Sequence, residues 1–133
     1  MSFTTINLKT IGDERGSLIA LENNAEIPFE VKRVYYIFGT QKGVERGFHA
    51  HKVLRQMAIC VSGSCTIRME DASDKGEVVL ATPEQALMIE PMQWHEMYNF
   101  SPDCVLMVLA NDVYDESDYI RNYEAYKRLI GHE

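Results

Sequence analysis

The feature that most limits the fold of this chain is a series of short apolar, β-branched and aromatic runs, which recur about every ten residues. Turn-forming residues separate the runs, for example Asn23-Asn24 and Ser62-Gly63. A regular series of short strands is typical of a β-sandwich or a β-barrel. We expect strands at residues 4–9, 17–22, 31–38, 46–56, 56–61, 65–70, 77–81, 86–90, 94–100 and 104–111. The run 31–38, which is rich in β-branched and aromatic side chains, is expected to be covered on both faces.

The last part of the chain has a different period, with apolar and aromatic residues at spacings of three and four. These positions are Tyr119, Ile120, Tyr123, Tyr126, Leu129 and Ile130. We expect a helix from Asp118, with Asp115 or Ser117 capping its start, Gly131 at its end, and its tyrosine stripe docked on the barrel. The sequence therefore predicts one all-β domain over residues 1–133, with the barrel over about 1–112 and a short helical tail over about 113–133.

Composition argues against several classes of function. The formal net charge is −7 and no basic cluster or stripe is present, which argues against nucleic-acid binding. The longest apolar run, 105–110, is too short to span a bilayer, and the first residues lack the basic lead and apolar core of a signal peptide. We therefore expect a cytoplasmic protein that does not enter the membrane, in which Cys60, Cys65 and Cys104 stay reduced and buried.

Chemically active side chains are concentrated in the stretch 46–56, RGFHAHKVLRQ. Because successive side chains on a strand point to opposite faces, His49 and His51 share one face. Arg46 and Lys52 place positive charge beside two imidazoles that titrate near neutral pH, an arrangement that suits acid–base work on an anionic substrate. The alternative is that the pair is a packing feature. The candidates for a local phosphate-binding pocket are Arg15, Arg33, Arg46, Lys52, Arg55 and Arg68.

Two further spacings resemble the two-part pattern of the cupin superfamily, small jelly-roll barrels with a site in the barrel mouth. The matching positions are His49, His51, Gln56 and Gly63, followed by Pro91, His95 and Asn99. The chain departs from the metal-binding cupins at Gln56, where they usually carry glutamate, and at Gln93, where they usually carry glycine. A neutral amide in place of a charged ligand weakens the case for a divalent cation, although a three-histidine site stays open.

A closer resemblance covers nearly the whole chain. It is carried by KRVYYI at 32–37, RGFHAHK at 46–52, WHEM at 94–97 and the tail segment 114–123. On these strings the chain resembles the dTDP-sugar 3,4-ketoisomerases, which convert dTDP-4-keto-6-deoxyglucose to its 3-keto isomer during deoxyamino-sugar synthesis for surface polysaccharide. The resemblance implies a cupin homodimer that needs no metal or other cofactor, with the strand at 4–9 available to pair with the neighbouring subunit. An aminotransferase would be linked to it by the pathway alone.

The reaction accounts for a histidine pair. Moving a ketone from C4 to C3 removes the proton on C3, passes through an enediol and returns a proton to C4. Neutral imidazoles with a pKa near 6.5 suit both proton transfers. No electrons leave the substrate, so no nicotinamide is required, and the sequence has no glycine-rich dinucleotide motif.

The resemblance also implies roles for particular residues. His49 and His51 form the acid–base pair. The sugar site is lined by Tyr35, Arg46 and His95, of which Tyr35 and Arg46 would stabilise the developing oxyanion. The nucleotide or its diphosphate contacts Arg33, Lys52 and Gln56. Arg15 and His95 differ between the enzymes that give the galacto product and those that give the gluco product, and the combination found here resembles the galacto branch.

Two other functions stay open. A metallo-cupin, either an oxygenase or a metal-dependent isomerase, would use His49, His51 and His95 as ligands. A non-catalytic cupin would bind a nucleotide sugar without turning it over. Trp94, which alternates with His95 along its strand, is expected to pack, and no role is expected for His132.

Overall fold

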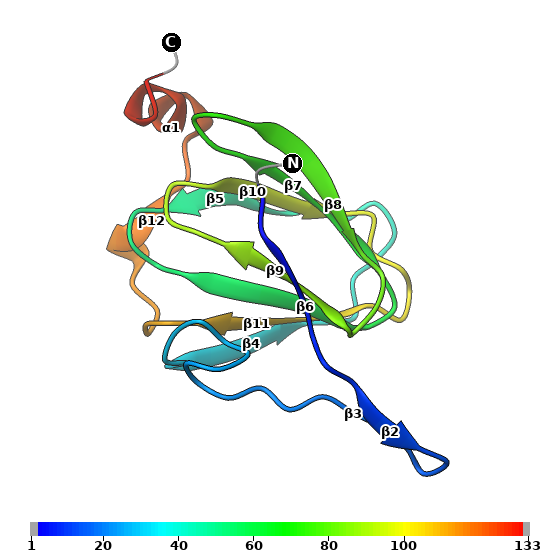
Figure 1. The fold of residues 1–133 in the computed structure, drawn as a ribbon. Helices are drawn as coiled ribbons and strands as arrows, with labels where there is room; N and C mark the ends of the chain where they lie inside the picture. Colours follow the sequence, from blue (N-terminus) through cyan, green and yellow to red (C-terminus); the bar gives the residue numbers. More distant parts are fainter. Residues whose placement is uncertain (1–2, 132–133) are drawn as a thin grey trace.

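The structure, a computed structural model, describes residues 3–131, so that His132 lies outside the described residues. The chain forms two facing β-sheets with one short helix (Figure 1). The strands are β1 (Thr5–Asn7), β2 (Ile11–Asp13), β3 (Gly16–Leu18), β4 (Arg33–Ile37), β5 (Arg46–His51), β6 (Gln56–Ser62), β7 (Cys65–Glu70), β8 (Lys75–Leu80), β9 (Gln85–Ile89), β10 (Trp94–Tyr98), β11 (Val105–Ala110) and β12 (Tyr119–Ile120). A 3₁₀ turn, η1 (Glu116–Asp118), precedes β12, and the helix α1 (Tyr123–Leu129) follows it.

The strand order identifies the architecture. One sheet has the order β1-β9-β6-β11-β4 and the other has the order β12-β5-β10-β7-β8. The eight strands β4 to β11 thus supply four strands to each sheet, which is the arrangement of a jelly roll. The prediction of an all-β jelly roll with a short C-terminal helix is confirmed.

The space between the sheets is filled by the inward rows of both. Because side chains alternate along a strand, each strand gives every second residue to this core. Its fully buried members include Ala58 and Cys60 of β6, Ile67 and Met69 of β7, and Leu106 and Val108 of β11. The outer face of β6 is covered in turn, since Met57 and Ile59 pack against Ile27 and Phe29 of the segment that precedes β4.

The three cysteines meet at one end of this core. All are free and buried, and the Sγ atoms of Cys60 and Cys104 lie 3.5 Å apart. The expectation of reduced, buried cysteines therefore agrees with their placement.

The tail docks on the outer face of the second sheet through aromatic residues. Tyr126 is fully buried, its ring lies 5.4 Å from that of Trp94, and both pack with Ala50 and Ile120. The Tyr126 hydroxyl lies 2.8 Å from two backbone carbonyl oxygens. The packing roles expected for Tyr123, Tyr126 and Trp94 are confirmed, whereas Tyr119 of the same predicted stripe lies in β12.

The predicted start of the helix is wrong. The helix begins at Tyr123, where the side chain of Asn122 accepts a hydrogen bond from the amide of Ala125 (2.8 Å). Asp115 caps η1 instead. Residues 119–120 form β12 because the open edge of β5 offers them backbone partners, and local periodicity contains no sign of that edge. Gly131 does end the helix, with a φ of 85°. Nowhere in residues 3–131 is a helix long and apolar enough to cross a membrane.

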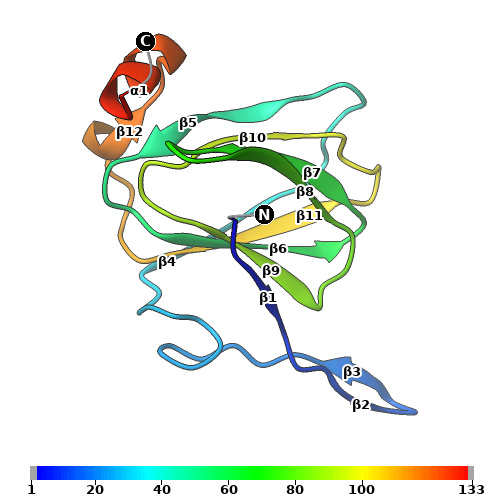
Figure 2. The same ribbon diagram turned by 45° about the horizontal axis from the view of Figure 1, so that its top comes forward.

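The predicted strand at 17–22 is also wrong. Only residues 16–18 are paired, in the hairpin β2–β3, which is exposed along its length and projects from the barrel (Figures 1 and 2). Ile19 and Leu21, which follow, pack on the apolar cluster outside β6 rather than extend the ladder.

Strand β4 is covered on one face only, contrary to the prediction for 31–38. It is the end strand of its sheet, and its outward residues Val34 and Tyr36, together with Phe38 just beyond it, are 52%, 62% and 68% exposed. An apolar composition therefore did not mean burial here.

Candidate active site

Three histidines converge inside the barrel where β5 pairs with β10. His49 lies opposite His95 in this pairing, and their ring centroids are 4.5 Å apart. The ring of His51 lies 4.9 Å from that of His49. His95 is 0% exposed, His51 is buried and His49 is half-buried. The neighbour Ala50 faces the helix, which confirms that His49 and His51 share one face of the strand.

Each of these rings is held through its Nδ1 atom. The partners are the carbonyl oxygen of Gly47 for His49 (3.0 Å), that of Gln93 for His95 (3.2 Å), and the carboxylate of Asp118 for His51 (3.2 Å). These oxygens only accept, so Nδ1 carries the proton in each neutral ring and Nε2 is left as an acceptor. The Nε2 atoms of His51 and His95 are buried and have no partner in the described part of the chain.

Burial keeps the three rings uncharged. It lowers the pKa of all three histidines because a charged imidazole loses its hydration in the barrel. The pKa of His95 falls to about 3. Repulsion from a charged His49 lowers the pKa of His51 further, while Asp118 acts in the opposite direction. At neutral pH the cluster therefore presents proton acceptors.

A β-bulge brings Arg46 to the same side as these rings. Regular alternation would turn Arg46, three residues before His49, to the opposite face. Here His95 pairs with His49 but Glu96 pairs with Gly47, so that Phe48 is an extra residue. Gly47 and Phe48 have φ values of 89° and 61°, and a Cβ on Gly47 would lie 2.8 Å from the carbonyl oxygen of His95. A glycine is required there.

A cavity of about 370 Å³ opens beside His49. Its lining includes Arg33, Tyr35, Arg46, His49, Tyr119 and Arg121. Three guanidinium groups favour an anionic ligand. Within residues 3–131 neither Arg33 nor Arg46 forms an ion pair, and the buried Nε of Arg33 has no hydrogen-bond partner. Tyr35 accepts a hydrogen bond from Gln56 (2.8 Å), which leaves its own proton free to be donated, and burial raises the pKa of this phenol.

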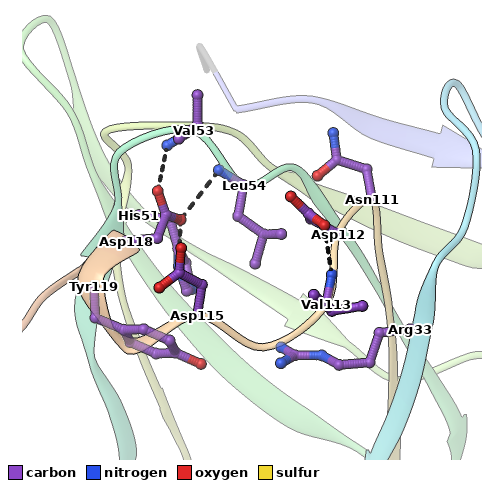
Figure 3. A pocket seen from close by; sticks show the side chains of 10 residues that line it. All are labelled: Arg33, His51, Val53, Leu54, Asn111, Asp112, Val113, Asp115, Asp118 and Tyr119. Carbon is purple, nitrogen blue, oxygen red and sulfur yellow. Dashed lines mark hydrogen bonds and ion pairs between the residues drawn. The ribbon is translucent and has the colours of Figure 1, made fainter.

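A second cavity of about 210 Å³ lies beside His51 and Asp118 (Figure 3). Arg33 and Tyr119 line both cavities and therefore stand between them. The rings of His49 and His51, one at each cavity, both pack against Tyr119, with centroids at 4.8 Å and 4.3 Å.

The structure brings some of the predicted site residues together and separates others. The larger cavity collects Tyr35, Arg46 and Arg33 around His49, and the smaller one holds His51. His95 and Gln56 lie beneath the site and line neither cavity. Lys52 is exposed outside both cavities. Arg15 lies in the turn of the projecting hairpin β2–β3, paired with Asp13.

Sequence reasoning missed three residues that the tail contributes. Asp118 holds His51, Tyr119 packs on both histidines, and the guanidinium of Arg121 lies 4.2 Å from the centre of the Tyr119 ring. The periodicity predicts that Tyr119 lies in the helix, but the pairing of β12 with β5 places it at the site. The signal for all three was their position in the tail segment 114–123, which carries part of the resemblance.

A jelly roll in which histidines converge beside an opening between the sheets is a cupin. Comparison with known proteins defines the family more closely. The sequence model of the family FdtA (WxcM-like, C-terminal) matches residues 1–131. The chain belongs to this family.

Its relatives include isomerases of known structure. The chain is 52% identical over 130 residues to the TDP-4-oxo-6-deoxy-alpha-D-glucose-3,4-oxoisomerase of Aneurinibacillus thermoaerophilus, covering 98% of this chain and 94% of the other. It is 43% identical to QdtA, a sugar 3,4-ketoisomerase from Thermoanaerobacterium thermosaccharolyticum in complex with TDP, over 96% and 93% of the chains with a TM-score of 0.93. For the WlaRB TDP-quinovose 3,4-ketoisomerase from Campylobacter jejuni the identity is 50%, the coverage 96% and 98%, and the TM-score 0.91. The chain is therefore an isomerase, and the predicted resemblance is confirmed.

Proposed function

We propose that this chain is a 3,4-ketoisomerase that converts dTDP-4-keto-6-deoxyglucose to dTDP-3-keto-6-deoxygalactose. The observation that carries the proposal is the convergence of uncharged histidines, each with Nε2 left as an acceptor, beside a cavity lined by arginines. The named activities of the relatives support the substrate class. The reaction belongs to deoxyamino-sugar synthesis in the cytoplasm, upstream of an aminotransferase.

The geometry suggests how the proton transfers proceed. An imidazole Nε2 of the pair His49 and His51 takes the proton from C3, and the C4 carbonyl oxygen gains a proton as the enediol forms. Tyr35 and Arg46, which line the same cavity as His49, stabilise the negative charge that develops on this oxygen. The hydroxyl at C3 then loses its proton while C4 receives one. The ketone moves to C3, and no electrons are exchanged with a second reactant.

The experiment that tests this function is incubation of the protein with dTDP-4-keto-6-deoxyglucose in heavy water. We expect a 3-keto product that carries deuterium at C4, since the proton returned there comes from a group in exchange with solvent. Recovery of the unchanged substrate without deuterium would reject the isomerase and leave the sugar-binding cupin. Boiled protein serves as the control for spontaneous exchange.

A second candidate function is a metal-dependent cupin, and one observation favours it. One ring nitrogen from each of His49, His51 and His95 lies within 4.8 Å of the others, which suits a divalent cation. The rest of the donor set fits less well. Gln56 supplies a neutral amide where a charged oxygen would be preferred: its Nε2 donates to Tyr35, and its buried Oε1 has no hydrogen-bond partner among the described residues. We therefore assign the chemistry to the side chains.

The galacto configuration of the product is the finer part of the proposal. Its support is the combination of Arg15 and His95, which resembles the galacto-forming branch. Overall identity does not support it, because WlaRB is 50% identical and is named for quinovose, the gluco isomer. Proton coupling constants distinguish an axial hydroxyl at C4 from an equatorial one. We expect an axial hydroxyl, and changes at Arg15 or His95 should erode this preference before turnover is lost.

The hairpin that carries Arg15 projects away from the barrel of its own subunit (Figure 2). In a homodimer this hairpin would bring Arg15 toward the site of the other subunit. We propose that two copies associate, with the exposed apolar face of β4 (Val34 and Tyr36) as part of the contact. Among the described residues β1 pairs with β9 and is the end strand of its sheet, so that its other edge is available to a neighbour. Light scattering is expected to give twice the chain mass of 15.2 kDa, and a monomer at working concentration contradicts the dimer.

A further inference from the structure

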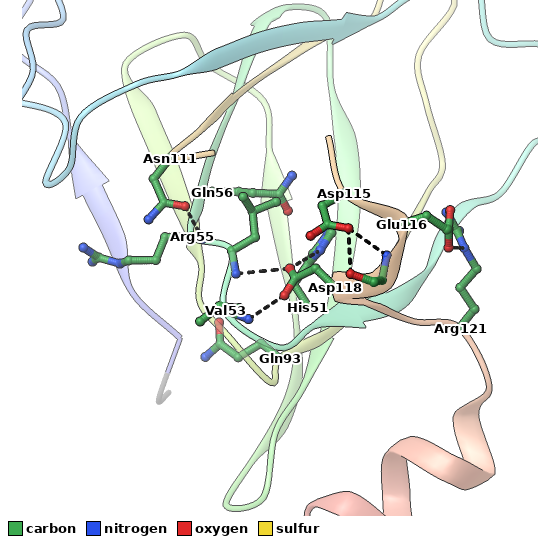
Figure 4. A network of polar contacts seen from close by, with 12 residues as sticks. His51, Val53, Arg55, Gln56, Gln93, Asn111, Asp115, Glu116, Asp118 and Arg121 are labelled. Atoms are coloured by element: carbon green, nitrogen blue, oxygen red, sulfur yellow. Dashed lines mark hydrogen bonds and ion pairs between the residues drawn. The ribbon is translucent and has the colours of Figure 1, made fainter. Parts of the chain in front are cut away.

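Asp118 is the most heavily engaged carboxylate near the histidine cluster. Its side chain is only 11% exposed. One carboxylate oxygen accepts from the amide of Val53 (2.9 Å; Figure 4). The other accepts from the amide of Leu54 (3.2 Å; Figure 3) and from Nδ1 of His51 (3.2 Å). Both oxygens are therefore fixed in direction.

The two amides belong to the turn that follows β5. His51 is the last residue of that strand, so the amides just beyond it have no ladder partner and Asp118 supplies one. The tail is held at the same point by its backbone, because the amide of Lys52 donates to the Asp118 carbonyl (3.0 Å) and Tyr119 pairs with His51. Docking of the tail thus places a carboxylate in a set orientation against one ring.

His51 differs from the other two histidines in the charge of its partner. The Nδ1 atoms of His49 and His95 face backbone carbonyls, whereas that of His51 faces an anion. A carboxylate stabilises an imidazolium more than a carbonyl does, since a hydrogen bond between charged groups is roughly twice as strong as a neutral one. The ring beside Asp118 is therefore the one best suited to hold a proton taken from the substrate.

We propose that Asp118 is a positioning residue, which holds His51 with the proton on Nδ1 and stabilises the charged ring after it accepts a proton from the sugar at Nε2. This inference rests on the proposed isomerase function. It assigns the initial proton removal to His51 and leaves His49, whose Nδ1 is bound to a carbonyl, as the partner.

A capping role alone would also explain the bonds to Val53 and Leu54, and a matched variant separates the two roles. Asp71 likewise accepts from two backbone amides, of Ser73 and Asp74 (both 2.9 Å), and from the side chain of Gln93 (3.3 Å). Asp71→Asn therefore makes the same chemical change at a capping carboxylate that touches no histidine.

The experiment compares Asp118→Asn, Asp118→Glu and Asp71→Asn by kcat, KM and thermal unfolding. An amide has one acceptor oxygen, so Asp118→Asn cannot serve all three donors and provides no anion. We expect kcat to fall about 100-fold, the size typical of losing acid–base assistance, with KM changed less than threefold. Asp118→Glu should recover part of kcat, and Asp71→Asn should keep it. Equal kcat in Asp118→Asn and wild type, or a loss shared with Asp71→Asn, overturns the proposal.

A measurement on the unaltered protein keeps the proposal testable if Asp118→Asn does not fold. The ¹⁵N NMR spectrum of the imidazoles, assigned with His51→Asn, reports which ring nitrogen carries the proton. We expect the Nδ1–H form at His51, and a dominant Nε2–H form would overturn the role of Asp118. This result is independent of turnover, so a chain without isomerase activity would reject the proposed function and leave the contact with Asp118 to be judged on its own.

Discussion

The barrel contains two clusters of the same size and very different character. Three histidines meet where β5 pairs with β10, and three cysteines meet at the other end of the inward rows. In each cluster the potential ligand atoms lie within 4.8 Å of one another. The cysteines line neither of the two cavities at the histidines, and the Sγ of Cys60 is already engaged with the carbonyl of Ser62 and with Cys104.

The comparison shows that proximity alone does not make a site. Burial favours the uncharged form in both clusters, because it lowers the pKa of the histidines and raises that of the Cys60 and Cys65 thiols, with Cys60 at about 12. The chemical result is opposite. An uncharged imidazole has a lone pair that accepts a proton, whereas an uncharged thiol is neither a good nucleophile nor a metal ligand. The histidine cluster also has a cavity and cationic neighbours.

The largest expected difference between the clusters is in turnover. His49→Asn and His51→Asn should each lower kcat by about 100-fold or more, because each removes a proton-transfer group. Cys60→Ala and Cys104→Ala should keep kcat within a factor of about two, since no reacting atom touches a thiol. Isomerase assays on folded variants, checked by circular dichroism, measure both. Near wild-type rates in the two histidine variants would invalidate the acid–base assignment.

The second difference is in acid stability. His95 stays neutral when folded but binds a proton near pH 6.5 when unfolded, so the unfolded chain binds more protons as the pH falls. His95 should contribute its whole stabilising effect above about pH 7. Because of this residue, the free energy of unfolding should fall by about 2 kcal/mol between pH 7 and pH 5. Urea unfolding across that range tests it. We expect the free energy of unfolding of His95→Gln to change less with pH in this range, and that of Cys65→Ala to change as in the wild type. An equal pH dependence in the wild type and both variants would contradict the assignment.

The cysteine cluster should set the opposite limit. Burial raises the pKa of the Cys65 thiol far above its ordinary value of 9.0, so the unfolded chain releases a proton that the folded chain retains. Cys65 should therefore contribute its whole stabilising effect below about pH 8, and the free energy of unfolding should fall by about 1 kcal/mol near pH 10 because of this thiol. The same urea series continued to alkaline pH measures this. In Cys65→Ala the free energy of unfolding is expected to depend less on pH at alkaline pH only. An unchanged pH dependence there would show that other groups control it.

The smallest expected effect is that of chelation. Exhaustive treatment with EDTA should leave turnover unchanged within error, because Gln56 takes the place of the anionic ligand that a metal centre would prefer. Metal analysis of the protein before and after treatment provides the control. If activity disappears and one divalent ion restores it, the histidine cluster is a metal centre and the assignment to side chains alone must be withdrawn.

Much of the fold could be predicted because most strands carry a local signal. The strands from β6 to β11 lie close to their predicted runs, and the jelly-roll order came from the resemblance. The errors share one cause. Each depends on which sheet edges are paired with another strand and which faces are covered. The three cases are the exposed face of β4, the end of β3 at residue 18, and the strand formed by residues 119–120. Local periodicity contains no information about distant partners.

The residues of the site also differ in whether local sequence can place them. Alternation along one strand was enough to place His49 and His51 on a common face, since both lie on β5. Asp118 is 67 residues away from His51 in the sequence, and its approach depends on the pairing of β12 with β5. Arg46 is predicted both from its position beside the histidines and from the resemblance, but its place in the cavity depends on a bulge, since regular alternation would turn it to the other face.

That bulge also governs which changes in chain length β5 can accept. On a regular strand, adding or removing one residue turns every side chain beyond that point to the other face, whereas a change of two preserves the facing. Deleting Phe48 should remove the bulge but keep both histidines in register with β10 and leave Arg46, then two residues before His49, on the cavity side. One residue inserted between Arg46 and Gly47 should instead turn Arg46 out of the cavity. The loop at 39–45, which precedes the strand, should accept insertions of either parity because no inward-facing row depends on its length. Comparing length variants in the loop with those in β5 would thus separate two effects. One is the effect of changing the chain length, and the other is the effect of turning a side chain to the other face.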